Sequence, residues 1–393
     1  MPILVYLLAL AVFAQGTSEF MLAGLLPGIS ADLNIPISSA GLLTSAFALG
    51  LVIGAPVMAI VSRRLPMSAT LSGFLAVFIA MHVIAALGSS FEILLTSRAV
   101  SAFAYAGFLA VTLSSIMRVV PQRIQPRAIS IILAGTTLAL IVGVPAGAAF
   151  GEVLGWRATF WGVAALCLPA ALMLPFVRST QHVALRDEGQ HVDGLGDPTP
   201  KLHAEFAALK QPKLLQAIVL AVLVNAATFC SFTYLAAISV QRAGIAQPLV
   251  PLVLTLFGVG SFAGVLLAGK LGQLPWRRIV LPGTLLLGAL WLGLAAVSDR
   301  QLGVWIIAVA LGAASFAVGS TLIARVLQTS AGAPTLGGAY STTALNLGAF
   351  LGPALGGAAI TWFGLLAPPL LSAIFVLSAA LLIVFSRHSA AQS

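Results

Sequence analysis

Long apolar segments separated by short polar stretches run along this chain from one end to the other. An α-helix needs about 20 apolar residues to cross a bilayer. The strands of a transmembrane barrel would instead be short and would alternate in polarity. The pattern therefore predicts an all-α membrane protein with twelve transmembrane helices, over residues 3–27, 40–61, 68–88, 92–117, 128–151, 158–177, 214–236, 248–271, 279–297, 302–324, 335–360 and 367–386.

Composition and charge support a membrane location. The 393 residues are 60% hydrophobic and 7% charged, more apolar than a soluble core can use. If the N-terminus is cytoplasmic, 15 of the 19 Lys and Arg residues fall on the inner side and three, Arg157, Arg242 and Arg300, on the outer side. The positive-inside rule then predicts a bacterial cell-membrane protein with both termini in the cytoplasm. The net charge of +9 is a consequence of topology and does not indicate a nucleic-acid partner.

One long hydrophilic stretch, residues 178–213, interrupts the apolar pattern. It contains several Asp, Glu, Gly and Pro residues, a composition typical of a linker. We therefore expect three parts: a six-helix half over 1–177, a cytoplasmic linker over 178–213, and a second six-helix half over 214–393.

The two halves resemble each other weakly. Leu65-Pro66 matches Leu274-Pro275 at an offset of 209 residues, and Pro145 matches Pro353 at an offset of 208. Each proline-containing helix also carries a row of glycines at helical spacing, Gly143, Gly147 and Gly151 in one and Gly348, Gly352 and Gly356 in the other. Small residues at this spacing let two membrane helices approach closely. Parallel repeats of six helices are an architecture of secondary transporters, so we expect two pseudo-symmetric halves.

Two charged residues, Glu19 and Arg98, lie deep inside predicted spans. A charge at the centre of a bilayer costs at least ~2.5–3.5 kcal/mol, so it normally faces a partner, a cavity or an ion pathway. Their predicted depths agree, but whether they touch depends on helix rotation. A cavity carboxylate that changes its protonation state would suit proton coupling, while a static ion pair between helices is the structural alternative.

Other polar residues in the spans are candidates for substrate contacts. Gln15 lies one turn before Glu19 on the same helix face, and Tyr105, Asn225 and Asn346 could donate or accept hydrogen bonds. For each of them, a hydrogen bond between helices is an equally good interpretation. We expect His82 to be a packed histidine rather than a proton relay, and Arg325 to be an interfacial anchor.

Several of these segments resemble the major facilitator superfamily, and within it the twelve-helix drug:proton antiporters. The run Gly143-Val144-Pro145-Ala146-Gly147 with Gly151 is similar to the antiporter motif of helix 5, and Gly352-Pro353-Ala354-Leu355-Gly356-Gly357 is its counterpart in helix 11. Leu94-Leu95-Thr96-Ser97-Arg98 resembles the helix 4 motif whose arginine is tied to proton coupling. Helices 1 and 2 look most like those of actinobacterial chloramphenicol-efflux permeases, over Phe13–Phe20, Gly24–Pro27 and Ala40–Ala48.

The resemblance implies the major facilitator fold, with Glu19 and Arg98 in proton coupling. It also implies a role in conformational change for Gly143, Pro145, Gly147, Gly151, Gly352 and Pro353. One position departs from the family pattern: Ser62 stands where the loop after helix 2 usually carries an Asp. The basic residues of the loop are present, but the carboxylate that would complete a charge-based gate there is missing.

The function that we expect is proton-coupled efflux of a small, largely uncharged antibiotic such as chloramphenicol. An exporter of sugars or other small metabolites would keep the same fold, and a membrane enzyme or a channel is the alternative from another class. Zinc-protease and hydrolase motifs are absent from the sequence, so we expect no enzyme, metal or cofactor. Transport would then draw on the proton gradient, or on ATP hydrolysed by another protein. We expect a monomer whose partners are its substrate, protons and the lipid bilayer.

Overall fold

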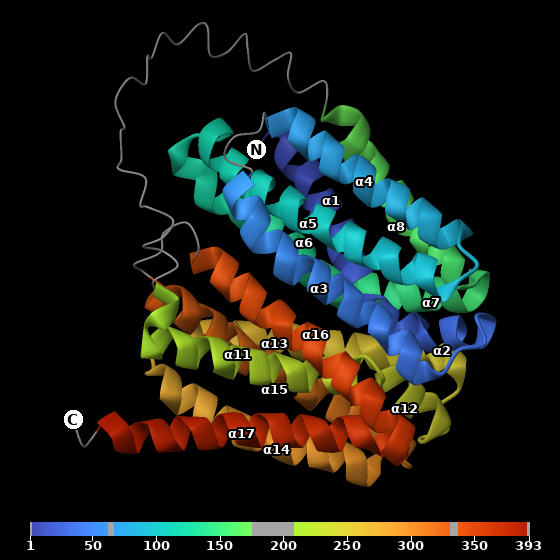
Figure 1. Cartoon of the computed structure of the whole chain (residues 1–393), viewed down its shortest axis with the longest axis vertical. Helices are drawn as coiled ribbons and strands as arrows, with labels where there is room; N and C mark the ends of the chain where they lie inside the picture. The colour runs from blue at the N-terminus through green and yellow to red at the C-terminus, as the bar shows by residue number, and fades with distance from the viewer. Residues whose placement is uncertain (1, 62–66, 175–207, 331–336, 391–393) are drawn as a thin grey trace, which may run out of the picture.

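The structure, a computed structural model, describes residues 2–61, 67–174, 208–330 and 337–390. Within these ranges the chain is helical and forms two bundles that lie side by side (Figure 1). The first bundle contains α1 (Ile3–Phe20), α2 (Leu22–Asp32), α3 (Ile37–Val61), α4 (Met67–Leu87), α5 (Phe91–Val119), α6 (Gln125–Leu138), α7 (Val144–Leu154) and α8 (Trp156–Met173). The second contains α11 (Pro212–Phe232), α12 (Leu235–Gln241), α13 (Val250–Leu271), α14 (Trp276–Val297), α15 (Gln301–Thr329), α16 (Gly337–Phe363) and α17 (Ala367–Ala390).

The predicted membrane spans are confirmed as helices. Eleven segments in the described part of the chain are long and apolar enough to cross a membrane, and one of them, Gly337–Ser386, contains both α16 and α17. The first predicted span, 3–27, differs in detail, because the helix breaks at Met21 and α2 continues to Asp32. The span 214–236 breaks in the same way between α11 and α12. Hydropathy records how apolar a segment is and not its direction, so it could not show these breaks.

Most of the predicted linker lies outside the described residues, and so do Ser62 and the Leu65-Pro66 pair. The boundaries of the two halves therefore stay predictions. The buried apolar side chains do form two hydrophobic cores, one drawn mainly from each bundle.

The bundles are in close contact at the end where α2 and α12 lie, which we call the α2/α12 end; the opposite end, where both chain termini lie, is the termini end (Figure 1). Tyr234, between α11 and α12, packs into the core of the first bundle and donates a hydrogen bond to the carbonyl oxygen of Pro353 over 2.8 Å. Gly41 and Gly357 both lie against its hydroxyl group, where a side chain would clash. The Ser45 hydroxyl of α3 donates to the Phe350 carbonyl oxygen of α16 over 2.8 Å.

Both glycine rows lie at helix–helix contacts. In the first bundle, Gly143, Gly147 and Gly151 face a matching row of Thr17, Met21 and Leu25 on α1 and α2. In the second, Gly348, Gly352 and Gly356 face the backbone of α11 between Val222 and Cys230. The equivalent helix pair is thus closely packed in each bundle, as small residues at this spacing allow. The role of these glycines in conformational change stays a prediction.

The first glycine row follows a local irregularity. Residues Ala139–Gly143 form a π-helical segment between α6 and α7, and Pro145 follows it in the first turn of α7. A proline there has no N–H to donate, so the wider turn fits its position. Short π-helical segments inside α-helices occur frequently at functional sites.

A glycine substitution tests the tight contact between α11 and α16. A Cβ atom at Gly352 would meet the backbone of Ala226 and lie 2.8 Å from the Cys230 nitrogen. We expect Gly352→Ala to lower the stability of the protein by ~1–3 kcal/mol, because backbone atoms cannot move aside as a side chain can. Gly338→Ala, at the start of the same helix where no atom lies within 4 Å, is the matched control and should be neutral. Thermal unfolding in detergent measures both, and equal midpoints would contradict the packing described.

An ion pair joins the end of α2 to the start of α8 at the α2/α12 end. The Arg157 guanidinium and the Trp156 indole N–H both donate to the Asp32 carboxylate. The hydrogen bond from Arg157 is the main reason that the pKa of Asp32 lies below its ordinary value of 3.8. A carboxyl group whose pKa is lower in the folded state than in the unfolded state stabilises the folded protein at neutral pH. For Asp32 this stabilisation is lost as the pH falls from 3.8, the ordinary pKa, through the lower pKa of the folded state.

We expect this pair to contribute little, because the two side chains are 37% and 45% exposed. Asp32→Asn should lower the free energy of unfolding by no more than ~1 kcal/mol at neutral pH, and by less at high salt. Thermal unfolding at pH 7 with and without added salt measures this loss. A loss of several kcal/mol, or one that salt does not reduce, would contradict it.

Candidate functional site

A small cavity of about 140 Å³ lies between the two bundles. Its walls come from four helices, with α1 on one side and α11, α15 and α16 on the other. The lining residues are Glu19, Phe20, Asn225, Thr228, Phe229, Ser315, Phe316, Gly319, Ser320, Ile323, Leu345, Asn346 and Ala349. Three of the residues predicted from the sequence, Glu19, Asn225 and Asn346, are thereby brought together from three helices far apart in the sequence.

Glu19 is the one ionisable residue in this lining. It is half-buried, and no hydrogen bond to its carboxylate is present within the described ranges. The amides of the two asparagines are engaged, since Asn225 donates to the Leu345 carbonyl oxygen over 2.6 Å and Asn346 to that of Thr342 over 2.9 Å. Their side-chain oxygens remain to accept hydrogen bonds. The cavity lining therefore combines one carboxyl group and two amide side chains with mostly apolar residues.

Phenylalanines border the cavity on the side of the α2/α12 end. Phe20 of α1 and Phe229 of α11 stack across the two bundles with ring centroids 5.9 Å apart. They are 209 residues apart, the same offset that relates the two Leu-Pro pairs, so equivalent residues of the two halves meet here. Phe232, Phe257 and Phe316 continue the cluster, with centroids 4.5 Å apart for Phe232 and Phe257 and 6.4 Å for Phe257 and Phe316.

Arg98 lies behind Glu19, inside the first bundle, and is 1% exposed. Its guanidinium donates to the hydroxyl of Ser18 over 2.6 Å and to the Ser18 carbonyl oxygen over 2.8 Å. It also lies 4.1 Å from the centroid of the Phe47 ring, in a cation–π arrangement. Arg98 thus ties α5 to the residue directly before Glu19. Glu19 and Arg98 are close enough to interact electrostatically, but no salt bridge joins them. In this conformation the two charged groups therefore do not touch.

Ser18 extends this network to His82 of α4. The Ser18 hydroxyl accepts a hydrogen bond from Arg98, which can only donate, so its own proton is free to point to His82 Nε2 at 2.7 Å. His82 Nδ1 lies 2.8 Å from the Phe78 carbonyl oxygen, which can only accept. The Phe78 carbonyl oxygen thus requires a proton on Nδ1, and a neutral ring that accepts from Ser18 at Nε2 satisfies both partners. His82 is 1% exposed, consistent with a packed histidine.

Gln15 and Tyr105, the other predicted substrate residues, do not line the cavity. Gln15 is fully buried, and neither atom of its amide has a hydrogen-bond partner in the described part of the chain. Tyr105 is 3% exposed and packs with its ring centroid 6.3 Å from that of Phe47. Both belong to the interior of the first bundle, beside the Arg98 network. Their roles stay predictions.

Sequence reasoning missed Ser18, Phe47 and Ser315. Ser18 is the central residue of the Arg98 network, and the Ser315 hydroxyl in the cavity wall has no partner within the described chain. Serine and phenylalanine are common in membrane helices, so neither stands out by type. The one available indication was that Ser18 adjoins Glu19.

Two bundles of apolar helices with a carboxyl-bearing cavity between them are the architecture of a multi-pass membrane transporter. The family model described as "Major Facilitator Superfamily" matches residues 8–343, and the chain belongs to this superfamily, which is a transporter family and not an enzyme family.

Several relatives show how close the likeness is. A "Chloramphenicol resistance protein" of Streptomyces lividans is 48% identical over 355 residues, covering 90% of this chain and 88% of the relative. The "Inner membrane transport protein YdhP" of Escherichia coli K12 is 33% identical over 96% of this chain and 94% of its own length. A solved bacterial homologue of the human lysosomal transporter Spinster, inward-facing and unoccupied, shares the fold with a TM-score of 0.75 at 19% identity, over 98% of this chain and 96% of that one.

Proposed function

We propose that this protein exports a small, largely uncharged antibiotic such as chloramphenicol across the bacterial cell membrane in exchange for protons. The observation that carries the proposal is Glu19, a carboxyl group in the cavity between the bundles. The name of the Streptomyces relative, 48% identical over 90% of this chain, supports the substrate class. The apolar and aromatic wall suits an uncharged guest with a few hydrogen-bonding groups.

In this mechanism Glu19 takes up a proton when the cavity faces the outside and releases it when the cavity faces the cytoplasm. The drug binds best when Glu19 is deprotonated, so drug and proton compete for the same cavity. Arg98, held by Ser18 behind the carboxylate, favours the deprotonated form by its charge. No cofactor takes part, and the proton gradient supplies the driving force.

Alternating access would use the two bundles as rigid bodies. The distribution of Lys and Arg supports cytoplasmic termini, in which case the closed α2/α12 end would face outward. The cavity of about 140 Å³ is smaller than the ~300–1,000 Å³ of pockets that hold drug-sized ligands. Loading would therefore require the bundles to separate at the termini end. We propose that the protein works as a monomer, with the glycine rows permitting the helices to shift.

The accumulation of labelled chloramphenicol in cells that express the protein tests this function. We expect low accumulation that rises to the level of control cells when a protonophore collapses the proton gradient. Accumulation equal to that of control cells before the protonophore is added would remove chloramphenicol as a substrate.

Export of a sugar or another small metabolite is the second candidate. It is favoured by relatives named "Probable sugar efflux transporter" in Helicobacter pylori, one of which is 26% identical over 92% of this chain. The asparagine oxygens in the cavity would suit hydroxyl groups. The same accumulation measurement with labelled sugars separates the two candidates.

A further inference from the structure

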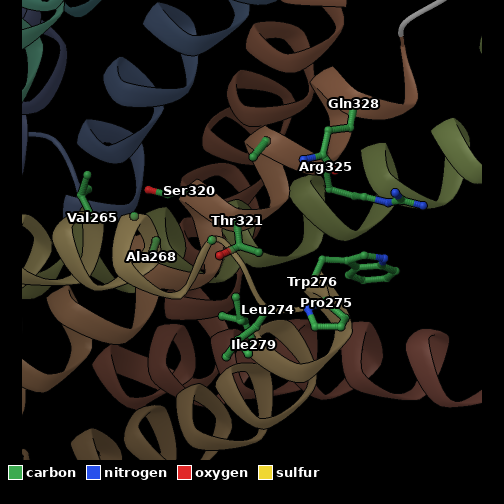
Figure 2. A pocket seen from close by; sticks show the side chains of 13 residues that line it. Val265, Ala268, Leu274, Pro275, Trp276, Ile279, Ser320, Thr321, Arg325 and Gln328 are labelled. Carbon is green, nitrogen blue, oxygen red and sulfur yellow. The ribbon is translucent and has the colours of Figure 1, made fainter.

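A second, larger cavity lies inside the second bundle at the termini end. Its volume is about 530 Å³, and its walls come from α13, α14 and α15 (Figure 2). This cavity and the cavity that contains Glu19 both lie against α15, and Ser320 lines both of them. The transport mechanism proposed above does not use this space.

Arg325 lines this cavity, and a second cation, Arg277, lies on the same tryptophan, Trp276. The guanidinium carbon of Arg325 lies 5.4 Å from the centroid of the Trp276 ring, and that of Arg277 lies at the same distance. Figure 2 shows the Arg325 side chain extended over the indole of Trp276. The one salt bridge found in the described residues joins Arg157 and Asp32, so neither arginine is neutralised by a carboxylate there. Like charges this close repel each other, and an anion between them would be stabilising.

The sequence shows that the second half cannot supply that anion. Residues 214–393 contain seven Lys and Arg residues and one acidic residue, Asp299. Asp299 lies two residues before the far end of α15 and 26 residues before Arg325, which at 1.5 Å per residue is about 39 Å away. The counter-charge for this cavity must therefore come from outside this half.

The chemistry of the walls indicates an anion with an apolar part. Val265, Ala268, Leu274 and Ile279 are apolar, while Ser320, Thr321 and Gln328 carry hydrogen-bonding groups beside Arg325. Trp276 begins α14, at the helix end where tryptophan commonly marks the membrane–water interface. Basic pockets between transmembrane helices at this depth suit the headgroups of anionic lipids.

We propose that this cavity binds an anionic phospholipid. Its phosphate accepts hydrogen bonds from Arg325, and its glycerol and upper acyl chain lie against the apolar wall formed by α13 and α14. The bound phosphate removes the repulsion between Arg325 and Arg277 and holds the ends of α13, α14 and α15 together. The ligand chemistry is a phosphate group, and a soluble phosphate is the source that the experiment must separate from a lipid.

The test is titration of the purified full-length protein in detergent with phosphatidylglycerol, followed by native mass spectrometry and thermal unfolding. Phosphatidylcholine and inorganic phosphate are the comparison ligands. We expect phosphatidylglycerol to bind and to raise the unfolding temperature more than either. Arg325→Gln should weaken its binding about tenfold or more, as loss of a charge-assisted hydrogen bond predicts.

Two variants are matched controls. Lys270→Gln removes a charge from the same end of the bundle, outside the cavity lining, and Arg300→Gln removes one from the other end of α15. Both should bind phosphatidylglycerol as the unchanged protein does. Equal weakening by Lys270→Gln would mean diffuse surface attraction and would overturn the site. So would equal binding of phosphatidylcholine, while equal stabilisation by inorganic phosphate would replace the lipid with a soluble anion. If Arg325→Gln does not fold, Thr321→Val, which keeps every charge, should still weaken lipid binding.

Discussion

Glu19→Gln is expected to abolish chloramphenicol transport driven by a proton gradient. In proteoliposomes with an imposed pH difference, drug movement should fall to the level of liposomes without protein. Glutamine keeps the size and the hydrogen-bonding groups of the side chain but cannot take up or release a proton. Because glutamine resembles the protonated carboxyl group, the drug should bind the variant more weakly. At saturating drug, binding and the exchange of labelled for unlabelled drug should both persist, because neither step needs a net movement of protons.

Glu92→Gln is the matched control for this experiment. Glu92 lies in the first turn of α5, on the helix that carries Arg98, but it is exposed and does not belong to the cavity lining. Its loss should leave proton-driven transport unchanged. If Glu19→Gln transports as the unchanged protein does, then another group carries the proton and the proposed mechanism is wrong.

Ser18→Ala is expected to produce the second large effect. The substitution removes the hydroxyl that accepts a hydrogen bond from Arg98 and donates one to His82. Leaving buried polar groups unpaired costs about 1–3 kcal/mol, and more for a charged group, so the unfolding temperature should fall. Because Arg98 would then be held beside Glu19 only by the Ser18 carbonyl oxygen and the Phe47 ring, transport should fall more strongly than drug binding does. The ratio of transport rate to binding affinity separates this positioning role from a general loss of folded protein.

Three further variants make this prediction specific. Ser101→Ala removes a buried hydroxyl one turn after Arg98 that bonds only to carbonyl oxygens of its own helix, so it should have little effect. His82→Gln keeps an acceptor for the Ser18 hydroxyl and should retain most transport, whereas His82→Phe removes it and should resemble Ser18→Ala. Equal transport by the glutamine and phenylalanine variants would contradict a positioning role for His82.

The sequence predicted the helices well, because a bilayer-length apolar run has few structural alternatives. It also indicated the close helix pairs, since the rows Gly143–Gly151 and Gly348–Gly356 do face neighbouring helices. The breaks at Met21 and after Phe232 were not predictable in this way. Both breaks lie within apolar sequence, where a change in helix direction leaves the hydropathy unchanged.

The candidate site was predictable only in part. Glu19 stands out by type in any membrane helix, and Asn225 and Asn346 share the cavity with it. Gln15, four residues before Glu19, lies instead in the core of the first bundle. Depth in the membrane follows from position in the sequence, but the direction in which a side chain points depends on the rotation of each helix, which packing determines. For the same reason, Arg98 could be matched to Glu19 by depth while its actual partner, Ser18, was not foreseen.

Direct competition between drug and proton at Glu19 is the central claim, and proton release on drug binding tests it most directly. Saturating chloramphenicol would be added to the purified protein in weakly buffered detergent solution with a pH indicator. Binding should release protons from the unchanged protein, and the Glu19→Gln variant should bind the drug without releasing any. Drug binding to the unchanged protein without proton release, or equal release from the Glu19→Gln variant, would contradict the account.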